Sequence, residues 1–288
     1  MTQAEERPKS SNFNQLIVFD FDWSLVDQDT DRYLFEVLEP NLRKLLNHRK
    51  NQLQWTDNVA DCLRRLNDGG ATKSQIEQAF STLPLHPAMK RAIEALWNPI
   101  ELENYQDPKK VLNTKFLILS NSNSIFIELV LKHYNLYHLF EDSIITNPAH
   151  WDADHPDRIN LKRRVDPNGP QHTCSFGCSP NMCKGAELSG YLEKTQKKFD
   201  RIAYVGDGEN DFCPIVQLKK GDFALVRKFR GLSKRIEQEK SLGKQLDCAI
   251  IEWSGAWEVE QAFLNELSTC FVSSIAFLFF TQSYAFKW

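Results

Sequence analysis

The sequence lacks both a strong charge of one sign and an apolar run long enough to cross a bilayer. Its 288 residues carry 35 Lys and Arg against 38 Asp and Glu, a formal net charge of −3. Without a sustained basic surface, neither nucleic acid nor an anionic membrane is an expected partner. The most apolar stretch, residues 270–281, has about half of the ~20 residues that a spanning helix needs. We therefore expect a small-molecule ligand.

The beginning of the chain also lacks an export signal. Residues 1–14 are polar and contain no apolar segment, so we expect a short disordered lead. The 7 cysteines are then expected as thiols or metal ligands in a reducing compartment, and their odd count agrees. The sequence thus predicts a cytoplasmic protein. For the apolar C-terminal tail, residues 271–288, a buried terminal element and a loosely attached or membrane-touching segment are both open.

Short apolar runs that end in polar residues recur along the chain and are typical of strands buried on both faces. They lie at residues 16–20, 115–120, 143–146 and 201–206, with shorter runs at 223–226 and 248–251. Helical patterns separate them, for example at residues 124–134 and 184–198. This alternation predicts an α/β fold with a doubly wound, mostly parallel sheet.

One long interval contains no strand pattern. Residues 27–107 hold only amphipathic helical segments, such as 33–46, 55–66 and 73–80. We therefore predict a helical cap inserted after the first strand, with an α/β core formed by residues 1–26 and 108–270. Ligands of open α/β sheets bind beyond the carboxyl ends of the strands, so the insert is expected to cover the site as a lid.

Two acidic clusters follow predicted strands. Asp20 and Asp22 leave the first strand two residues apart, and buried carboxylates are costly unless something uses them. Their spacing suits a nucleophile beside a general acid/base. Asp207 and Asp211 follow the strand that ends at Gly206 and offer the hard oxygen ligands that Mg²⁺ prefers. Taken alone, each cluster is equally well explained as a polar turn that caps the next helix.

Two further pieces suit phosphate binding. Ser120 and Asn121 close another strand just before a helical pattern, where a hydroxyl and main-chain N–H groups suit phosphate oxygens. Lys184 begins a helix, where its ammonium could neutralise phosphate charge. Each signal is weak alone, since a lone lysine is nearly always on the surface. The placement of three of the four pieces directly after strands is what points to one site.

In this order, the motifs resemble those of the haloacid dehalogenase superfamily of phosphotransferases. They read Asp-Phe-Asp-Trp-Ser from Asp20, Leu-Ser-Asn-Ser around Ser120, Lys184, and Gly-Asp-Gly-Glu-Asn-Asp from Gly206. The resemblance is closer to the group of phosphoethanolamine/phosphocholine and pyridoxal-phosphate phosphatases. It rests on Val18-Phe-Asp-Phe-Asp22 with Asp31, Pro84-Leu-His-Pro87, Asn181-Met-Cys-Lys-Gly185 and the run from Tyr204 to Pro214, and it covers roughly residues 16–251.

The resemblance implies a Mg²⁺-dependent phosphatase that forms an aspartyl-phosphate. Asp20 would attack phosphorus, Asp22 would act as acid and base, and Ser120 and Lys184 would hold the phosphoryl group. Asp20, Asp207 and the main-chain carbonyl of Asp22 would bind Mg²⁺, with Asp211 supporting the metal directly or through water. Asn121 and Asp31 are further candidates for substrate binding. Asn121 stands where the family usually has Asp, which would relax a preference for a cationic amine.

The expected substrate is a small phosphate ester, such as phosphocholine, phosphoethanolamine, pyridoxal phosphate or thiamine monophosphate. Other readings remain: a phosphotransferase, a phosphatase acting on a protein, and a non-catalytic binding or regulatory protein on the same fold. The complete set of charged groups favours the enzyme, because a binding module would not need all of them.

Four soft ligands lie close together just before Lys184. They are His172, Cys174, Cys178 and Cys183, and such a set could bind Zn²⁺. The alternative is a loop that carries packed or exposed thiols.

Overall fold

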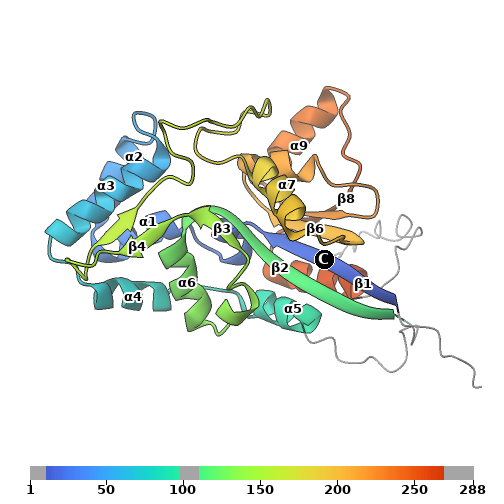
Figure 1. The fold of residues 1–288 in the computed structure, drawn as a ribbon, viewed down its shortest axis with the longest axis horizontal. Coiled ribbons are helices and arrows are strands. Elements are labelled where there is room, and N and C mark those ends of the chain that lie inside the picture. Colours follow the sequence, from blue (N-terminus) through green and yellow to red (C-terminus); the bar gives the residue numbers. More distant parts are fainter. Residues whose placement is uncertain (1–10, 98–109, 269–288) are drawn as a thin grey trace, which may run out of the picture.

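A sheet of six strands lies at the centre of the computed structural model, which describes residues 11–97 and 110–268 (Figure 1). Its order is β3-β2-β1-β6-β7-β8, and every neighbouring pair is parallel. The strands are β1 (Ser11–Phe19), β2 (Lys110–Asn123), β3 (Ile144–Asn147), β6 (Arg201–Gly206), β7 (Phe223–Arg227) and β8 (Ala249–Trp253). All six predicted strands are confirmed, and so is the doubly wound α/β fold.

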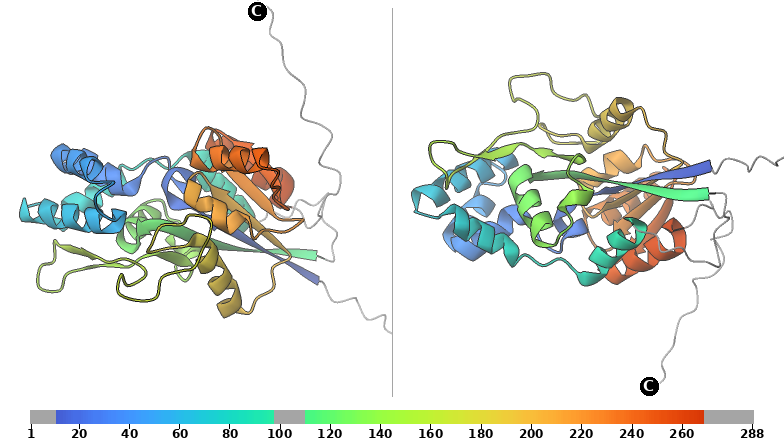
Figure 2. Two further views of the ribbon diagram at one scale, coloured as in Figure 1. Left: turned by 90° about the horizontal axis from the view of Figure 1, so that it is seen from above. Right: turned by 60° about the horizontal axis from the view of Figure 1, so that its bottom comes forward.

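Both faces of the sheet are covered by helices. Side chains along a strand alternate between its faces, so each strand can contribute to an apolar cluster on either side of the sheet. Leu16 and Val18 of β1 pack in one apolar cluster, whereas Ile17 and Phe19 pack in another. The first cluster is completed by α7 (Lys184–Thr195) and α9 (Gly231–Ser241), and the second by α5 (Pro87–Trp97), α6 (Ser124–His133) and α10 (Ala256–Ala262). Figures 1 and 2 show the sheet between these two sets of helices.

Four helices follow β1 and lie beyond the carboxyl ends of the strands (Figure 1). They are α1 (Thr30–Leu38), α2 (Pro40–His48), α3 (Trp55–Asp68) and α4 (Lys73–Ser81). The single helical segment predicted over residues 33–46 is in fact two helices. Proline has no N–H group and fixes its own φ, so Pro40 begins a new helix, and the Glu39 side chain accepts a hydrogen bond from the Asn41 N–H.

The last helix of the predicted insert has a different environment. α5 packs against α10 and β2, which belong to the predicted core. Residues 98–107 lie outside the described residues, so the boundary at residue 107 stays a prediction. A hairpin of β4 (Ala149–Trp151) and β5 (Ile159–Leu161) also packs against α3. Its three-residue strands are too short to give an alternating pattern in the sequence.

The structure tests the predictions for the two ends of the chain only in part. Ser11 to Asn14 were expected in a disordered lead, but they pair with residues 110–113 and form the start of β1. The rest of that lead and the apolar tail, residues 271–288, lie outside the described residues. Among residues 11–97 and 110–268, no helix is long and apolar enough to cross a membrane.

Candidate active site

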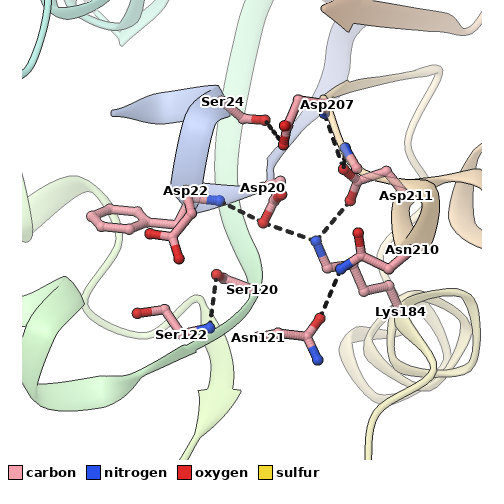
Figure 3. A network of polar contacts seen from close by, with 12 residues as sticks. Asp20, Asp22, Ser24, Ser120, Asn121, Ser122, Lys184, Asp207, Asn210 and Asp211 are labelled. Atoms are coloured by element: carbon pink, nitrogen blue, oxygen red, sulfur yellow. Dashed lines mark hydrogen bonds and ion pairs between the residues drawn. The ribbon is translucent and has the colours of Figure 1, made fainter. Parts of the chain in front are cut away.

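The predicted site residues meet where the strand order reverses. β1 lies between β2 and β6, and the chain runs from β1 outward to β2 and β3 before it returns to β6 on the other side. At such a switch point the loops diverge and leave a crevice for a ligand. Asp20 follows β1, Ser120 lies near the end of β2, and Asp207 follows β6 (Figure 3).

Asp20 is held from one side only. The residue is 6% exposed, and its Oδ1 accepts hydrogen bonds from the Phe21 N–H at 2.7 Å and from Lys184 Nζ at 2.8 Å. Oδ2 accepts no hydrogen bond from any residue that the structure describes. One oxygen of this buried carboxylate is therefore fixed, and the other is left for a ligand.

Lys184 and Asp211 form a buried support behind Asp20. Lys184 is 1% exposed at the start of α7, and its Nζ lies 2.7 Å from Asp211 Oδ1. The same oxygen accepts the Tyr204 hydroxyl at 2.7 Å, while Oδ2 accepts the N–H groups of Asp207 at 3.0 Å and Gly208 at 2.9 Å. Both oxygens of Asp211 are thus occupied by the protein itself.

This close packing requires glycine at position 206. A Cβ there would lie 2.8 Å from the Asp211 carboxylate and 2.9 Å from the Tyr204 ring. Such distances are shorter than any ordinary contact, so a larger residue would push Asp211 away from the loop that it holds. Because the loop carries Asp207, its position depends on this one glycine.

A single wide turn, η1 (Phe21–Leu25), brings three more side chains to the site. Asp22 Oδ1 accepts the N–H of Thr30, the first residue of α1, at 3.1 Å. Trp23 has a left-handed backbone (φ 59°), and the Arg230 guanidinium lies 4.1 Å from its ring centroid. Ser24 Oγ donates to Asp207 Oδ1 at 3.4 Å. The turn therefore joins β1 to the first helix of the insert through the Asp22 carboxylate.

The end of β2 is linked to its surroundings on both sides. Ser120 Oγ accepts the Ser122 N–H at 3.2 Å, and Asn121 Oδ1 accepts the Asn210 side-chain amide at 2.9 Å (Figure 3). The hydroxyls of Ser122 and Thr30 are 2.6 Å apart. These contacts tie the strand to the acidic loop after β6 and to α1.

A cavity of about 180 Å³ opens over these groups. Six predicted residues line it, namely Asp20, Asp22, Asp31, Ser120, Asn121 and Asp207. Lys184 and Asp211 do not line it but lie behind Asp20. Sequence reasoning missed Trp23, Asp29, Trp55 and Asn210, which complete the wall. Trp55 reaches the cavity from α3, and its Nε1 donates to Asp31 Oδ2 at 2.7 Å.

Burial and crowding set the charges of the carboxyl groups. Burial, and then the neighbouring Asp211, raise the pKa of Asp20 well above its usual range, although Lys184 opposes the shift. The same two causes raise the pKa of Asp207 to about 6. Burial, and then Asp29 and Asp31, raise the pKa of Asp22, which favours its protonated form. Burial opposes the charge of Lys184, but Asp20 and Asp211 hold its pKa above its usual value.

The donor set fits a hard divalent cation. Oxygens of Asp20, Asp207 and Asp211 lie within 4.8 Å of one another, and all three residues are buried. Among the described residues, Lys184 supplies the only ammonium that contacts these three carboxyl groups directly. In their ionised forms they would carry two more negative charges than this ammonium balances, and Mg²⁺, which prefers carboxylate oxygens, would offset that excess. Because both Asp211 oxygens are already occupied, Asp20 and Asp207 are the better direct ligands.

A second cluster contains only thiols. Cys174, Cys178, Cys183 and Cys213 have sulfur atoms within 4.8 Å of one another. His172, which the sequence suggested as a partner, is not a member, because its Nε2 contacts the Ser179 carbonyl at 2.8 Å. Cys213 was missed because it lies on another element, the short helix α8 (Phe212–Ile215).

Comparisons with known proteins give a consistent family. A family model described as Putative Phosphatase matches residues 15–267. Pyridoxal phosphate phosphatase PHOSPHO2 of Bos taurus is 30% identical over 250 residues, which cover 85% of this chain and 95% of that protein. Inorganic pyrophosphatase 2 of Arabidopsis thaliana is 28% identical over 258 residues, which cover 89% and 85%.

Solved structures resemble the fold at lower identity. The HAD family hydrolase t0658 of Salmonella enterica subsp. enterica serovar Typhi superposes with a TM-score of 0.55 at 15% identity, covering 87% of this chain and 70% of that one. A protein of unknown function from Bordetella pertussis Tohama I gives 0.52 at 12% identity, covering 83% and 98%. This likeness concerns the fold, which is the α/β fold of haloacid dehalogenase hydrolases.

Proposed function

Because the chain belongs to the Putative Phosphatase family and is a phosphatase of the haloacid dehalogenase type, we propose that it hydrolyses a small phosphate monoester through a phosphoryl group on Asp20. The observation that carries this proposal is the state of the Asp20 carboxylate. One oxygen is fixed by Lys184 and the Phe21 N–H, the other has no partner among the described residues, and Asp20 lines the cavity. A buried carboxylate held in this way suits a nucleophile.

In the first half of the reaction, the Asp20 carboxylate attacks phosphorus and the bond to the leaving alkoxide breaks. Asp22 protonates that alkoxide, so the alcohol leaves neutral. Lys184 and the Ser120 hydroxyl hold oxygens of the phosphoryl group during the transfer. Phosphoryl transfer needs mainly alignment and neutralisation of charge, which these side chains supply.

In the second half, the aspartyl-phosphate is hydrolysed. Asp22 is now ionised and takes a proton from a water, which attacks phosphorus on the face that the alcohol left. Inorganic phosphate departs, Asp20 is restored as a carboxylate, and Asp22 again carries a proton. Asp22 thus acts first as an acid and then as a base, and its hydrogen bond from the Thr30 N–H orients it for both steps.

We propose Asp20, Asp207 and the main-chain carbonyl of Asp22 as ligands of Mg²⁺, with Asp211 in support. When bound, the ion supplies Lewis-acid stabilisation of charge on the phosphoryl oxygens. The hydrogen bonds that Asp211 accepts from the Asp207 and Gly208 N–H groups fit a supporting role, because they fix the loop that carries Asp207. Asp211 also orients Lys184.

Residues 27–107 are proposed as the cap of this site. Asp29 and Asp31 at the start of α1 and Trp55 at the start of α3 line the same cavity as Asp20. The cavity of about 180 Å³ is smaller than the ~300–1,000 Å³ of pockets for drug-sized ligands. A cavity of this size, with residues of the insert in its wall, favours a small metabolite and disfavours a phosphoprotein.

The part of the cavity wall that carries Asp31 favours a cationic leaving group. Asp29, Trp23 and Trp55 line the same cavity. Arg32 pairs with Asp29 at 3.3 Å and lies 5.2 Å from the Trp55 ring centroid, so Asp31 is the carboxylate we propose for a substrate cation. Carboxylates and aromatic faces both attract ammonium groups, and the carboxylates repel a second phosphate. We therefore propose an amino-alcohol phosphate, such as phosphoethanolamine or phosphocholine, ahead of pyridoxal phosphate, thiamine monophosphate or pyrophosphate.

Phosphate release from this panel, with Mg²⁺ and with a chelator, tests the proposal. We expect release that depends on Mg²⁺ and is fastest with an amino-alcohol phosphate. Fastest release from pyrophosphate would contradict the proposed leaving group but not the proposed chemistry. No release from any compound by folded, Mg²⁺-loaded protein would contradict the small-molecule phosphatase and favour a protein substrate or a binding role.

The role proposed for Asp31 can be tested by removing its charge. Asp31→Asn keeps an acceptor for Trp55 Nε1, and we expect it to lower kcat/KM for phosphocholine about tenfold. The value for p-nitrophenyl phosphate, whose leaving group is not cationic, should stay within about twofold. Equal losses for both substrates would contradict a role in recognising the cation.

The ionisation of Asp31 should make the preference for phosphocholine over p-nitrophenyl phosphate depend on pH. Burial, and then Asp29, raise the pKa of Asp31 to about 7, so its negative charge is lost as the pH falls through that value. The ratio of kcat/KM for phosphocholine to that for p-nitrophenyl phosphate should therefore fall below about pH 7 in the wild type. The ratio cancels the ionisations that affect both substrates equally, and in Asp31→Asn this fall at low pH should be lost.

A further inference from the structure

The four thiols gather from two separate parts of the chain. Cys174, Cys178 and Cys183 belong to the loop before α7, and Cys213 belongs to α8. Cys213 Sγ lies 3.4 Å from the sulfurs of both Cys174 and Cys183, and the sulfurs of Cys174 and Cys178 are 3.6 Å apart. Cys183 and Cys213 are buried, and the other two are half-buried.

These distances match a tetrahedral metal centre. A Zn–S bond is about 2.3 Å, which places the sulfurs of a tetrahedral Zn(Cys)₄ site about 3.8 Å apart. The observed separations are close to this value and far longer than the ~2.05 Å of a disulfide bond. Three residues separate Cys174 from Cys178, a spacing that is common in structural zinc sites. We propose that Cys174, Cys178, Cys183 and Cys213 bind one structural Zn²⁺ ion.

The loop that carries three of these cysteines needs such a restraint. Between β5 and α7 the described chain, residues 162–183, contains no helix or strand. Loops longer than about 12–15 residues without secondary structure are uncommon in compact domains unless something orders them. A metal bound by three residues of the loop and one of α8 would fix it against the core, and its binding energy would contribute to folding.

The proposed zinc site would lie beside the active site. Cys183 directly precedes Lys184, and Cys213 lies two residues after Asp211. The two segments also pack tightly, since a Cβ at Gly185 would lie 2.5 Å from Cys213 Sγ. The zinc would therefore join the two segments whose charged residues form the ion pair behind Asp20. It takes no part in phosphoryl transfer.

Metal analysis of the full chain tests this site. After purification under reducing conditions, we expect elemental analysis to give about one zinc per chain, falling below about a tenth in Cys174→Ser and Cys213→Ser. Cys248→Ala, which removes a buried thiol elsewhere, and His172→Ala should keep the zinc. Asp20→Asn should also keep it, so loss of the phosphatase reaction and loss of the zinc site can be told apart.

Two measurements on the wild type avoid variants that fail to fold. Replacement of the metal by Co²⁺ should give the visible bands of a tetrahedral thiolate complex, which oxygen ligands of the active site cannot produce. Zn²⁺ should also protect the four thiols from a thiol reagent. Iron in place of zinc, a wild type that takes up neither Zn²⁺ nor Co²⁺, or zinc retained by a folded Cys213→Ser variant would each overturn the proposal.

Discussion

Asp20→Asn is expected to lower kcat by at least about 10⁴-fold while leaving the fold intact, because an amide is a far poorer nucleophile than a carboxylate. Asparagine keeps the size of the side chain, and its amide oxygen can still accept hydrogen bonds from Lys184 and the Phe21 N–H. The substitution also removes one of three crowded carboxylates. We therefore expect little change in the melting temperature.

Labelling makes this test specific for the proposed intermediate. Wild-type protein quenched in acid during turnover of a phosphate ester with labelled phosphorus should carry label on the peptide that contains Asp20, and Asp20→Asn should carry none. Asp154→Asn, in an exposed turn, is the matched control and should keep full activity and labelling. Retained turnover by Asp20→Asn, or label on another residue, would contradict the aspartyl-phosphate mechanism.

The parts of the site that follow strand ends were predictable because strands buried on both faces leave a clear trace in the sequence. The apolar runs before Asp20, Ser120 and Asp207 mark three strands, and a parallel sheet brings their carboxyl ends to one edge. The joint position of these residues follows from topology, without any knowledge of side-chain packing. The same reasoning placed the insert after the first strand.

The residues that were missed depend on packing between helices, which periodicity does not encode. Trp55 lies on an amphipathic helix, where an aromatic residue is expected in the core, and only the position of α3 brings it to the cavity. Cys213 lies 30 positions after Cys183, and the two meet because α8 packs against α7. The supporting role proposed for Asp211 could be inferred only from the four hydrogen-bond donors that contact it in the structure.

Lys184→Met is expected to lower the free energy of unfolding by about 3–5 kcal/mol, because it leaves Asp20 and Asp211 as buried carboxylates without their shared cation. Methionine fills a similar volume, so the loss reports charge and not a cavity. Urea unfolding in a Mg²⁺-free buffer measures it. Lys198→Met, on an exposed lysine, should change stability by less than about 0.5 kcal/mol.

The loss of unfolding free energy in Lys184→Met should depend on pH. Without Lys184, the folded-state pKa of Asp20 stays raised above that of the unfolded chain, since burial and then repulsion by Asp211 favour protonation. Protonated Asp20 stabilises the fold at low pH, and this contribution is lost as the pH rises through its folded-state pKa. The deficit of Lys184→Met should therefore be larger at about pH 8 than at about pH 5.

A double variant separates the loss of stability from the loss of turnover in Lys184→Met. Lys184→Met with Asp211→Asn removes one of the stranded charges. The asparagine oxygen can still accept the Asp207 and Gly208 N–H groups while its amide donates to the Tyr204 hydroxyl, so the double variant should recover part of the lost stability. It should not recover turnover, because the proposed reaction needs the ammonium to hold the phosphoryl group. Full stability in the single variant would show that the buried ion pair contributes nothing to the fold, and recovered turnover in the double variant would remove Lys184 from the mechanism.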